Sequence, residues 1–441
     1  MNSFQKVLKS KTVREALENI PYSFFDIASF AAMMYFIINP LIEFILYLTH
    51  NQIFSGWKVA NRAVLLIGLI VLMIYVAVKK ENEDKIDLKS FLKNNIPIAL
   101  LMLFALLMII STLVNGVNSL SLFGYYYRGE GLFGYLSYIV YFLLMCINKN
   151  DKYKKIWINT FIGTAAVIEL YYVSAYLING TYDISFVFSH FNHYGYYLLM
   201  VLAVSSMWFI ISSSKAEKAA SLASVVLSTA ALVVCDTLGC IVAAIMGFVM
   251  ICIIMPIAKG KFSVKYIIPP LLFVLTFILL SVTSESLKTK SESNYSQLIN
   301  DTKAVSGSDE AEYSTGTTRI VLWQHGLQYI LEKPVFGHSA DATGERLETE
   351  TNDTDRCHCE YMNYAISFGI PAAVVYFAAM LSIYLRGLKH KKQLTDMNLL
   401  GLCSALFYLF SAAIGNTMYY TAPFLFILAG FGYYTEKNKI K

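Results

Sequence analysis

The sequence has few charged residues for its length. Only 15% of its 441 residues are charged, whereas 56% are hydrophobic, and the mean hydropathy is +0.53. A soluble domain of this size cannot bury so much apolar surface. The composition therefore excludes an ordinary soluble enzyme and indicates a protein that is embedded in a lipid bilayer.

Several common catalytic and nucleotide-binding motifs are absent from the sequence. It contains no Walker A loop, no GxGxxG motif after a strand, no HExxH and no GxSxG. We therefore expect neither a cytoplasmic nucleotide site nor a cofactor. The net charge of +5 comes from the flanks of apolar segments, so it does not indicate nucleic-acid binding.

The seven cysteines are scattered, and most of them lie inside apolar runs. The exception is the tetrapeptide "CHCE", which extends from Cys357 to Glu360. Cys357 and Cys359 are too close to form an unstrained disulfide. Adjacent side chains also point in different directions, and no second pair of ligands accompanies them, so no metal site is predicted. His358 is left as a catalytic base or a buried spectator.

Twelve apolar segments are long enough to cross about 30 Å of hydrocarbon. A backbone in lipid must satisfy its own hydrogen bonds, so such segments are expected to be helices. The sequence thus predicts an all-α polytopic membrane protein with about 12 transmembrane helices. The segments are 26–49, 60–78, 96–114, 131–147, 156–178, 193–211, 219–235, 238–257, 265–283, 360–385, 397–414 and 418–434.

The distribution of Lys and Arg orients the predicted bundle. With the N-terminus inside, 25 of the 35 Lys and Arg residues lie in cytoplasmic tails and connections, as the positive-inside rule requires. Both termini are therefore predicted to be cytoplasmic, and residues 1–20 to form a short amphipathic helix there. The chain divides into an N-terminal membrane bundle (1–283, helices 1–9), a large extracytoplasmic loop (284–358) and the C-terminal membrane helices 10–12 (359–441).

The second half of the large loop is predicted to contain a short amphipathic helix near 317–333. Thr317 or Thr318 is a suitable N-cap, and Pro334 follows the end. Arg319 and Trp323 are one turn apart and share a face. The helix is expected to lie on the membrane or over the mouth of the bundle, and the alternative is a plain amphipathic helix with a solvated Arg319.

Arginines and histidines gather on the predicted outer side. Arginine matches phosphate oxygens with a planar fork of donors, and histidine can take a proton from a hydroxyl near neutral pH. An outward-facing cleft with both residue types suits a phosphate-bearing substrate and proton transfer. The alternative for each arginine is a solvated surface charge. The outer residues are His50, His190, His193, His325, His338, His358, Arg128, Arg319 and Arg356.

Two acidic residues fall inside apolar segments and keep a second function open. Glu43 and Glu169 lie within predicted membrane helices, where acids usually face a bundle interior or a cavity. Glu43 has Arg62 as a possible partner. Such acids also suit an exporter or a proton-coupled transporter, although no internal repeat supports a transporter built from inverted repeats.

The loop and the following helix resemble a known family. In "TTRIVLWQHGLQYILEKPVFGHS" the residues Arg319, Trp323, Pro334 and Gly337 match the loop motif of the O-antigen ligase and O-antigen polymerase superfamily of bacterial membrane glycosyltransferases. The second motif is "HCEYMNYAISFGIPA", with His358, Tyr361 and Gly369. Weaker upstream similarities are carried by Arg128, Gly131 and Asn192, and the resemblance spans roughly 120–385.

The resemblance implies a multi-pass, GT-C-like protein of the bacterial cytoplasmic membrane with an extracytoplasmic active site. It implies a donor glycan on undecaprenyl diphosphate and an acceptor hydroxyl on a glycan, lipid or protein, without a metal. His358 would be the general base, and Arg319 would stabilise the leaving diphosphate. Substrate-binding candidates are Arg128, Arg356, Asn192, His193, Trp323 and Tyr361.

The sequence departs from the superfamily pattern at three positions. Cys359 stands where an amide or hydroxyl residue is usual, and Ala372 replaces the second glycine of a Gly-x-x-Gly motif. Leu238 occupies the place of an arginine that often lies between helices 7 and 8. The sequence distinguishes neither polymerase from ligase nor one glycan or acceptor from another.

Overall fold

The protein is helical throughout the part of the chain that the structure describes. The structure, a computed structural model, describes residues 3–49, 56–82, 92–181, 187–188, 190–283, 319–351, 354–416 and 419–434, with isolated positions between 289 and 303. No strand occurs in these residues. The predicted all-α class is confirmed.

Each of the twelve predicted apolar segments contains a helix. Among the described residues, eight helices are long and apolar enough to cross a membrane, whereas α8, α13, α19 and α20 are shorter. The chain is therefore a polytopic membrane protein, and twelve crossings remain a prediction. The eight are α3 (Tyr22–Leu48), α4 (Gly56–Asn82), α6 (Ile96–Asn115), α9 (Asp151–Asn179), α10 (Phe191–Ile211), α11 (Lys215–Cys235), α12 (Leu238–Lys259) and α18 (Ile370–Lys389), and the shorter four are α8 (Leu132–Ile147), α13 (Ile268–Thr283), α19 (Asp396–Ala412) and α20 (Ala422–Gly432).

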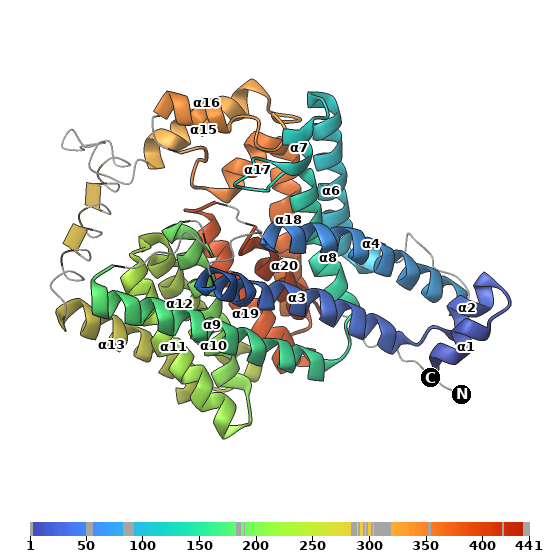
Figure 1. Cartoon of the computed structure of the whole chain (residues 1–441), viewed down its shortest axis with the longest axis horizontal. Helices are drawn as coiled ribbons and strands as arrows, with labels where there is room; N and C mark the ends of the chain where they lie inside the picture. Colours follow the sequence, from blue (N-terminus) through green and yellow to red (C-terminus); the bar gives the residue numbers. More distant parts are fainter. Residues whose placement is uncertain are drawn as a thin grey trace.

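Two predicted helices are interrupted in the structure. The single helix predicted for residues 1–20 is two helices, α1 (Ser3–Lys9) and α2 (Val13–Asn19). The hydroxyl of Thr12 caps α2 by accepting from the Glu15 N–H, which starts a new helix there. Both short helices lie beside the far end of α4 (Figure 1).

The predicted tenth helix is divided at Gly369 into α17 (Glu360–Phe368) and α18. Gly369 has a φ of +90°, and a Cβ there would lie 2.1 Å from the Val335 carbonyl oxygen. Only glycine fits a backbone that is both left-handed and in such close contact. The Ile370 N–H donates to the Pro334 carbonyl at 2.8 Å. The break therefore receives the turn that follows the loop helix.

Two helices, α10 and α20, form the centre of the bundle. All eleven residues of α20 are buried, and so are most residues of α10. Helices that are apolar on every side are expected in such a position. By contrast, α4 exposes Leu66, Ile70 and Met73, as a helix that faces lipid does. Figure 1 shows α10, α19 and α20 surrounded by the other helices.

The helices α15 (Arg319–Glu332) and α16 (Gly344–Thr351) lie together beyond the bundle, next to α17 (Figure 1). The sequence predicts an amphipathic helix where α15 lies, but it did not suggest α16. The proposed caps Thr317 and Thr318 lie outside the described residues. A separate apolar cluster joins α15 to α17, and its buried members are Leu322, Tyr329, Ile330, Leu347, Cys357, Ala365 and Ile366.

The end of the bundle where α8, α10, α12 and α20 begin is called the site end below. Its connections include the short helix α7 (Ser119–Phe123), residues 124–131 and residues 354–360. The end where the same four helices finish is called the opposite end. It carries two short 3-10 helices, η1 (Val264–Tyr266) and η2 (Lys391–Gln393).

Candidate active site

Contacts on both sides hold His358 in place along the chain. Two residues before it, Arg356 is 7% exposed and reaches the carboxylate of Asp341. The Cys357 N–H donates to the Asn363 side chain at 3.3 Å. After it, the buried Glu360 accepts hydrogen bonds from tyrosines of α18 and α19, at 2.8 Å and 2.7 Å. The residues around His358 are therefore fixed by contacts with several helices.

The backbone of His358 is left-handed, with a φ of +49°. This conformation is uncommon for residues other than glycine, and it clusters at functional sites when the surroundings enforce it. Among the described non-glycine residues, only Asp236, Ser339, Asp341 and His358 have a positive φ. All four lie in connections at the site end, which makes this end the candidate functional one.

Arg128 forms a two-pronged pair with Asp355. Its Nε donates at 2.7 Å, and its Nη2 also contacts the same carboxylate. The arginine and aspartate side chains are only 12% and 8% exposed. Burial opposes charge on Asp355, but the hydrogen bonds from Arg128 hold the pKa of this carboxyl below its ordinary value. The two residues are 227 positions apart and join two connections of the site end.

Glu130 lies next to this pair and is 1% exposed. Its Oε2 is 3.5 Å from Arg356, and its Oε1 has no hydrogen-bond partner within the described part of the chain. Burial raises the pKa of Glu130 to about 7, against the opposing effect of Arg356 and Arg128.

The first turns of α10 carry Asn192 and His193. The N-cap residue His190 accepts a hydrogen bond from the Asn192 N–H at 3.1 Å. His193 Nδ1 donates to the Phe188 carbonyl at 2.8 Å, and its ring packs against Tyr420. Arg128 interacts electrostatically with both histidines. The structure thus brings Arg128 close to the first turn of α10, which carries Asn192 and His193.

Arg319, the first residue of α15, reaches the start of α12. Its Nη2 is 3.9 Å from the position that a Cβ on Gly239 would occupy. Its Nε is buried and has no hydrogen-bond partner among the described residues. Leu238, the residue before Gly239, stands where the superfamily often has an arginine. One guanidinium is therefore available at this turn instead of two.

Tyr196 links the two halves of the site. It lies one turn after His193 on α10 and interacts electrostatically with Arg319, Cys359 and Glu360. Its hydroxyl donates to the Ser411 carbonyl at 3.4 Å. Arg319 and residues 359–360 therefore both lie near Tyr196.

Trp323 and Tyr361 make mainly packing contacts. Trp323 is partly buried against the apolar cluster of α15 and α17, and its indole Nε1 has no hydrogen-bond partner among the described residues. The Tyr361 hydroxyl donates to the Leu409 carbonyl at 3.0 Å. Tyr361 therefore ties α17 to α19, whereas Trp323 keeps an unused donor.

The pattern of the loop motifs matches a known family. The family model described as O-antigen ligase matches residues 222–377. This part of the chain is therefore similar to the O-antigen ligase family. The matched range extends from α11 into α18 and includes Arg319, His358 and Gly369. No curated protein matches the sequence closely enough to be reported. The match supports glycan transfer of the ligase or polymerase type in general.

The superfamily motifs have a structural explanation. Gly337 has a φ of +62°, and a Cβ there would lie 2.5 Å from the backbone of Ser367. The His338 N–H donates to the Ile366 carbonyl at 2.8 Å. Pro334 and Gly337 therefore dock directly on the turn at Gly369, so that the two motifs form one contact.

The acids inside the membrane helices make local contacts. Glu43 accepts a hydrogen bond from the Trp57 N–H at 3.3 Å, and Glu169 accepts one from Ser228 at 2.7 Å. Arg62, suggested as the partner of Glu43, lies over the Phe123 ring. These acids belong to the pairs α3–α4 and α9–α11.

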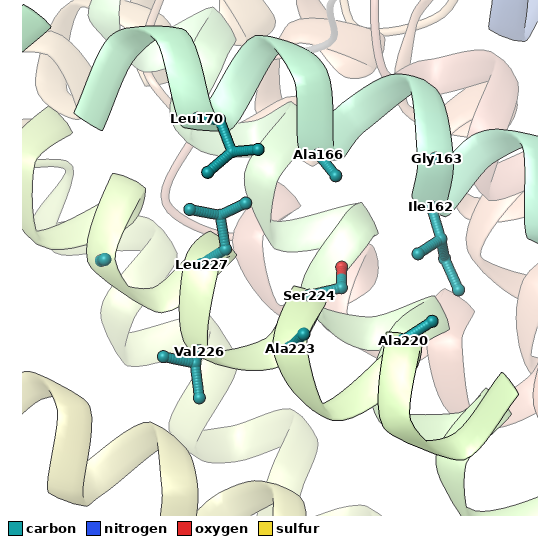
Figure 2. A pocket seen from close by; sticks show the side chains of 10 residues that line it. Ile162, Gly163, Ala166, Leu170, Ala220, Ala223, Ser224, Val226 and Leu227 are labelled. Atoms are coloured by element: carbon teal, nitrogen blue, oxygen red, sulfur yellow. The ribbon is translucent and has the colours of Figure 1, made fainter. Parts of the chain in front are cut away.

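A groove between α9 and α11 carries no reactive group (Figure 2). Ser224 is the one polar residue in its lining, and the Ser224 hydroxyl is 2.8 Å from that of Ser205. The remaining lining residues are Ile162, Gly163, Ala166, Leu170, Ala220, Ala223, Val226, Leu227 and Ala230.

Sequence reasoning missed the carboxylates of the site. Glu130, Asp341 and Asp355 pair with the two arginines that were assigned to substrate. A weak signal was present, because Glu130 follows Arg128 in "RGEG" and Asp355 precedes Arg356 in "DRCH". Short segments of mixed charge near a membrane often contain paired charges.

Proposed function

We propose that the protein transfers a glycan from undecaprenyl diphosphate to an acceptor hydroxyl at the outer face of the bacterial cytoplasmic membrane. One observation carries the proposal: residues from four separate segments, one of which is α10 itself, gather around the first turns of α10. They are Arg128, His193, Tyr196, Arg319 and the segment 355–360. A guanidinium and an imidazole are the two groups that this chemistry needs.

The transfer proceeds by attack of the acceptor oxygen on the anomeric carbon of the donor glycan. The bond between this carbon and the diphosphate oxygen breaks, and its electron pair leaves with the lipid diphosphate. His358 takes the proton of the acceptor hydroxyl, a contribution of about 10²–10⁴-fold in rate. The diphosphate is already an activated leaving group, so no nucleotide is needed.

Arg319 stabilises the charge that develops on the leaving diphosphate. A guanidinium that is fixed before the reaction stabilises such charge more than water does. The buried Nε of Arg319 lacks a partner among the described residues, which leaves it available to an oxyanion. Asn192, His193 and Trp323 are placed to contact the sugar or the phosphate.

Purified variants in proteoliposomes test this proposal with a lipid-linked glycan donor. His358→Gln and Arg319→Lys should each reduce transfer by about 100-fold or more. Matched controls are His325→Gln and Arg346→Lys, because both side chains bind Glu350 on the surface of the loop. These controls should keep their activity. Full transfer by His358→Gln would remove the general-base role.

Gene deletion decides between polymerase and ligase. Loss of long chains from both lipid-linked and surface glycan indicates a polymerase. Accumulation of long lipid-linked chains that no longer reach their acceptor indicates a ligase. An unchanged glycan pattern in the deletion strain would contradict both.

A further inference from the structure

Five charged residues of the site end form one buried group, called the charge cluster below. Its members are Arg128, Glu130, Asp341, Asp355 and Arg356. The side chains of both aspartates and of Glu130 are at most 8% exposed. Charges are buried in this way only when partners compensate them. The cluster therefore constrains the backbone segments that carry it.

The cluster joins three connections that are far apart in the sequence. Arg128 and Glu130 lie in 124–131, Asp341 precedes α16, and Asp355 and Arg356 precede α17. Asp341 also accepts the Tyr125 N–H at 2.8 Å. The Lys58 ammonium of α4 binds the Tyr126 carbonyl and holds the first connection from its other side.

We propose that Arg128 and Arg356 are positioning residues that hold His358 in its reactive place, and that they act through Asp355, Asp341 and Glu130 rather than by binding the diphosphate. This inference rests on the proposed function. It follows from where the donors of the two arginines point. Nε and Nη2 of Arg128 both bind Asp355, and Nη2 of Arg356 contacts Asp341 and Glu130.

The backbone of His358 explains why it needs such support. A left-handed φ at a histidine is disfavoured, so neighbouring contacts must maintain it. The charge cluster fixes the chain immediately before His358. On the other side, Glu360 is held by the hydroxyls of Tyr376 and Tyr408. His358 thus lies between two fixed positions of the chain, the charge cluster before it and Glu360 after it. Loss of the contacts at either position displaces His358.

A third tether acts on the residue next to His358. Asn363 accepts the Cys357 N–H and donates to Asn416 at 3.2 Å, in the connection before α20. The Cys357 thiol packs against α15, since a Cβ on Gly326 would lie 2.6 Å from its Sγ. Loss of the charge cluster should therefore shift the histidine without unfolding α17.

A double-mutant cycle on Arg128 and Asp355 separates positioning from diphosphate binding. Positioning predicts that Arg128→Gln and Asp355→Asn each lower kcat, by about 100-fold for a displacement of about 1 Å. The KM for the donor stays unchanged, and the double variant is no worse than either single one. Arg128→Lys, which can still pair with Asp355, should recover part of the kcat.

A different outcome is expected if Arg128 instead binds the diphosphate of the donor. Arg128→Gln then raises the KM for the donor, whereas Asp355→Asn keeps or improves activity because it frees the guanidinium. That result overturns the proposal. The matched control is the exposed pair of Arg346 with Glu332, at 2.8 Å in the same loop. Arg346→Gln and Glu332→Gln should leave kcat and KM unchanged.

Hydrogen exchange gives a readout that does not depend on transfer. In purified protein, Arg128→Gln and Asp355→Asn should both increase deuterium uptake in residues 355–359, and the Arg346→Gln control should not. Unchanged uptake in both cluster variants overturns the positioning role. If the wild-type protein transfers no glycan, the proposed function fails, and the exchange data still decide whether the cluster holds this segment.

Discussion

The ion pairs at the two ends of the bundle differ in how deeply they are buried. At the site end, Arg356 and Asp341 pair with side chains that are 8% and 0% exposed. At the opposite end, Lys259 pairs with Asp396 at 2.5 Å, but their side chains are 33% and 52% exposed. Exposed pairs contribute little to stability, whereas a buried charge is costly once its partner is removed. Buried ion pairs therefore fix the geometry of the site end, whereas the charges of the opposite end stay solvated and constrain it little.

Two glycines, one at each end, differ in how closely the backbone packs around them. Gly260 ends α12 at the opposite end with a φ of +66°, and nothing lies within 4 Å of a Cβ placed on it. Gly369 at the site end has a φ of +90° and no room for a Cβ. Gly260 is needed for its dihedral angle alone, whereas Gly369 is also needed for close backbone packing.

Removal of one partner from the charge cluster should have the largest effect. Arg356→Ala leaves Asp341 buried without its arginine, which is expected to lower the free energy of unfolding by about 3–5 kcal/mol. Thermal unfolding in nanodiscs measures it. A loss below about 1 kcal/mol would show that water compensates these carboxylates, and the contrast between the ends would fail.

Gly369→Ala should have the next largest effect. A left-handed alanine costs about 1–2 kcal/mol, and the overlap with the Val335 carbonyl adds about 1–3 kcal/mol. Gly260→Ala is the matched variant, because it carries the dihedral cost without the overlap. The two shifts in unfolding midpoint should therefore differ clearly, and equal shifts would contradict the packing argument.

The exposed charges of α16 should give a smaller, pH-dependent effect. Hydrogen bonds from Tyr329 and Arg346 lower the pKa of Glu350 from 4.5 to about 2. Because the pKa of Glu350 is lower in the folded state than in the unfolded state, its ionised form stabilises the folded protein at pH values above the unfolded-state pKa. This contribution is lost as the pH falls from about 4.5 to 2.

Because the Glu350 side chain is 32% exposed, its contribution should stay below about 1 kcal/mol. Melting curves of wild type and Glu350→Gln between pH 5 and pH 2 test this: the difference between them should be present at the upper end of this range and absent at the lower end. A constant difference would mean that Glu350 does not titrate in this window.

Lys259→Ala should have the smallest effect. Its pair with Asp396 is half exposed, so its loss should change the free energy of unfolding by about 0–1 kcal/mol. The change should shrink further in high salt, which screens exposed charges. A loss comparable to that of Arg356→Ala would erase the difference between the two ends.

Local patterns in the sequence predicted the helices of the bundle, because apolar length alone signals a helix in lipid. They also predicted a helix where α15 lies, from the spacing of Arg319, Trp323 and the apolar residues. The break at Gly369 was missed, since the apolar run continues through it. The turn that requires the break lies more than thirty residues upstream, at Val335.

The gathering of site residues was only partly predictable. Composition and motif similarity selected Arg319 and His358, but not the partners of the arginines. Arg128 pairs with a residue 227 positions away, and no local periodicity reveals such a contact. The sequence does not distinguish an arginine that pairs with a carboxylate from one that binds a phosphate. For this reason it predicts substrate binding for both Arg128 and Arg356.

The shortness of α20 has a consequence for the bilayer itself. Its eleven residues extend roughly 16 Å, about half of a hydrocarbon layer of about 30 Å. We therefore expect the connection before α20, where Asn416, Tyr419 and Tyr420 are buried, to lie below the membrane surface and to be enclosed by protein. Turnover should then respond to lipid chain length, with thinner bilayers bringing the headgroup layer closer to His358.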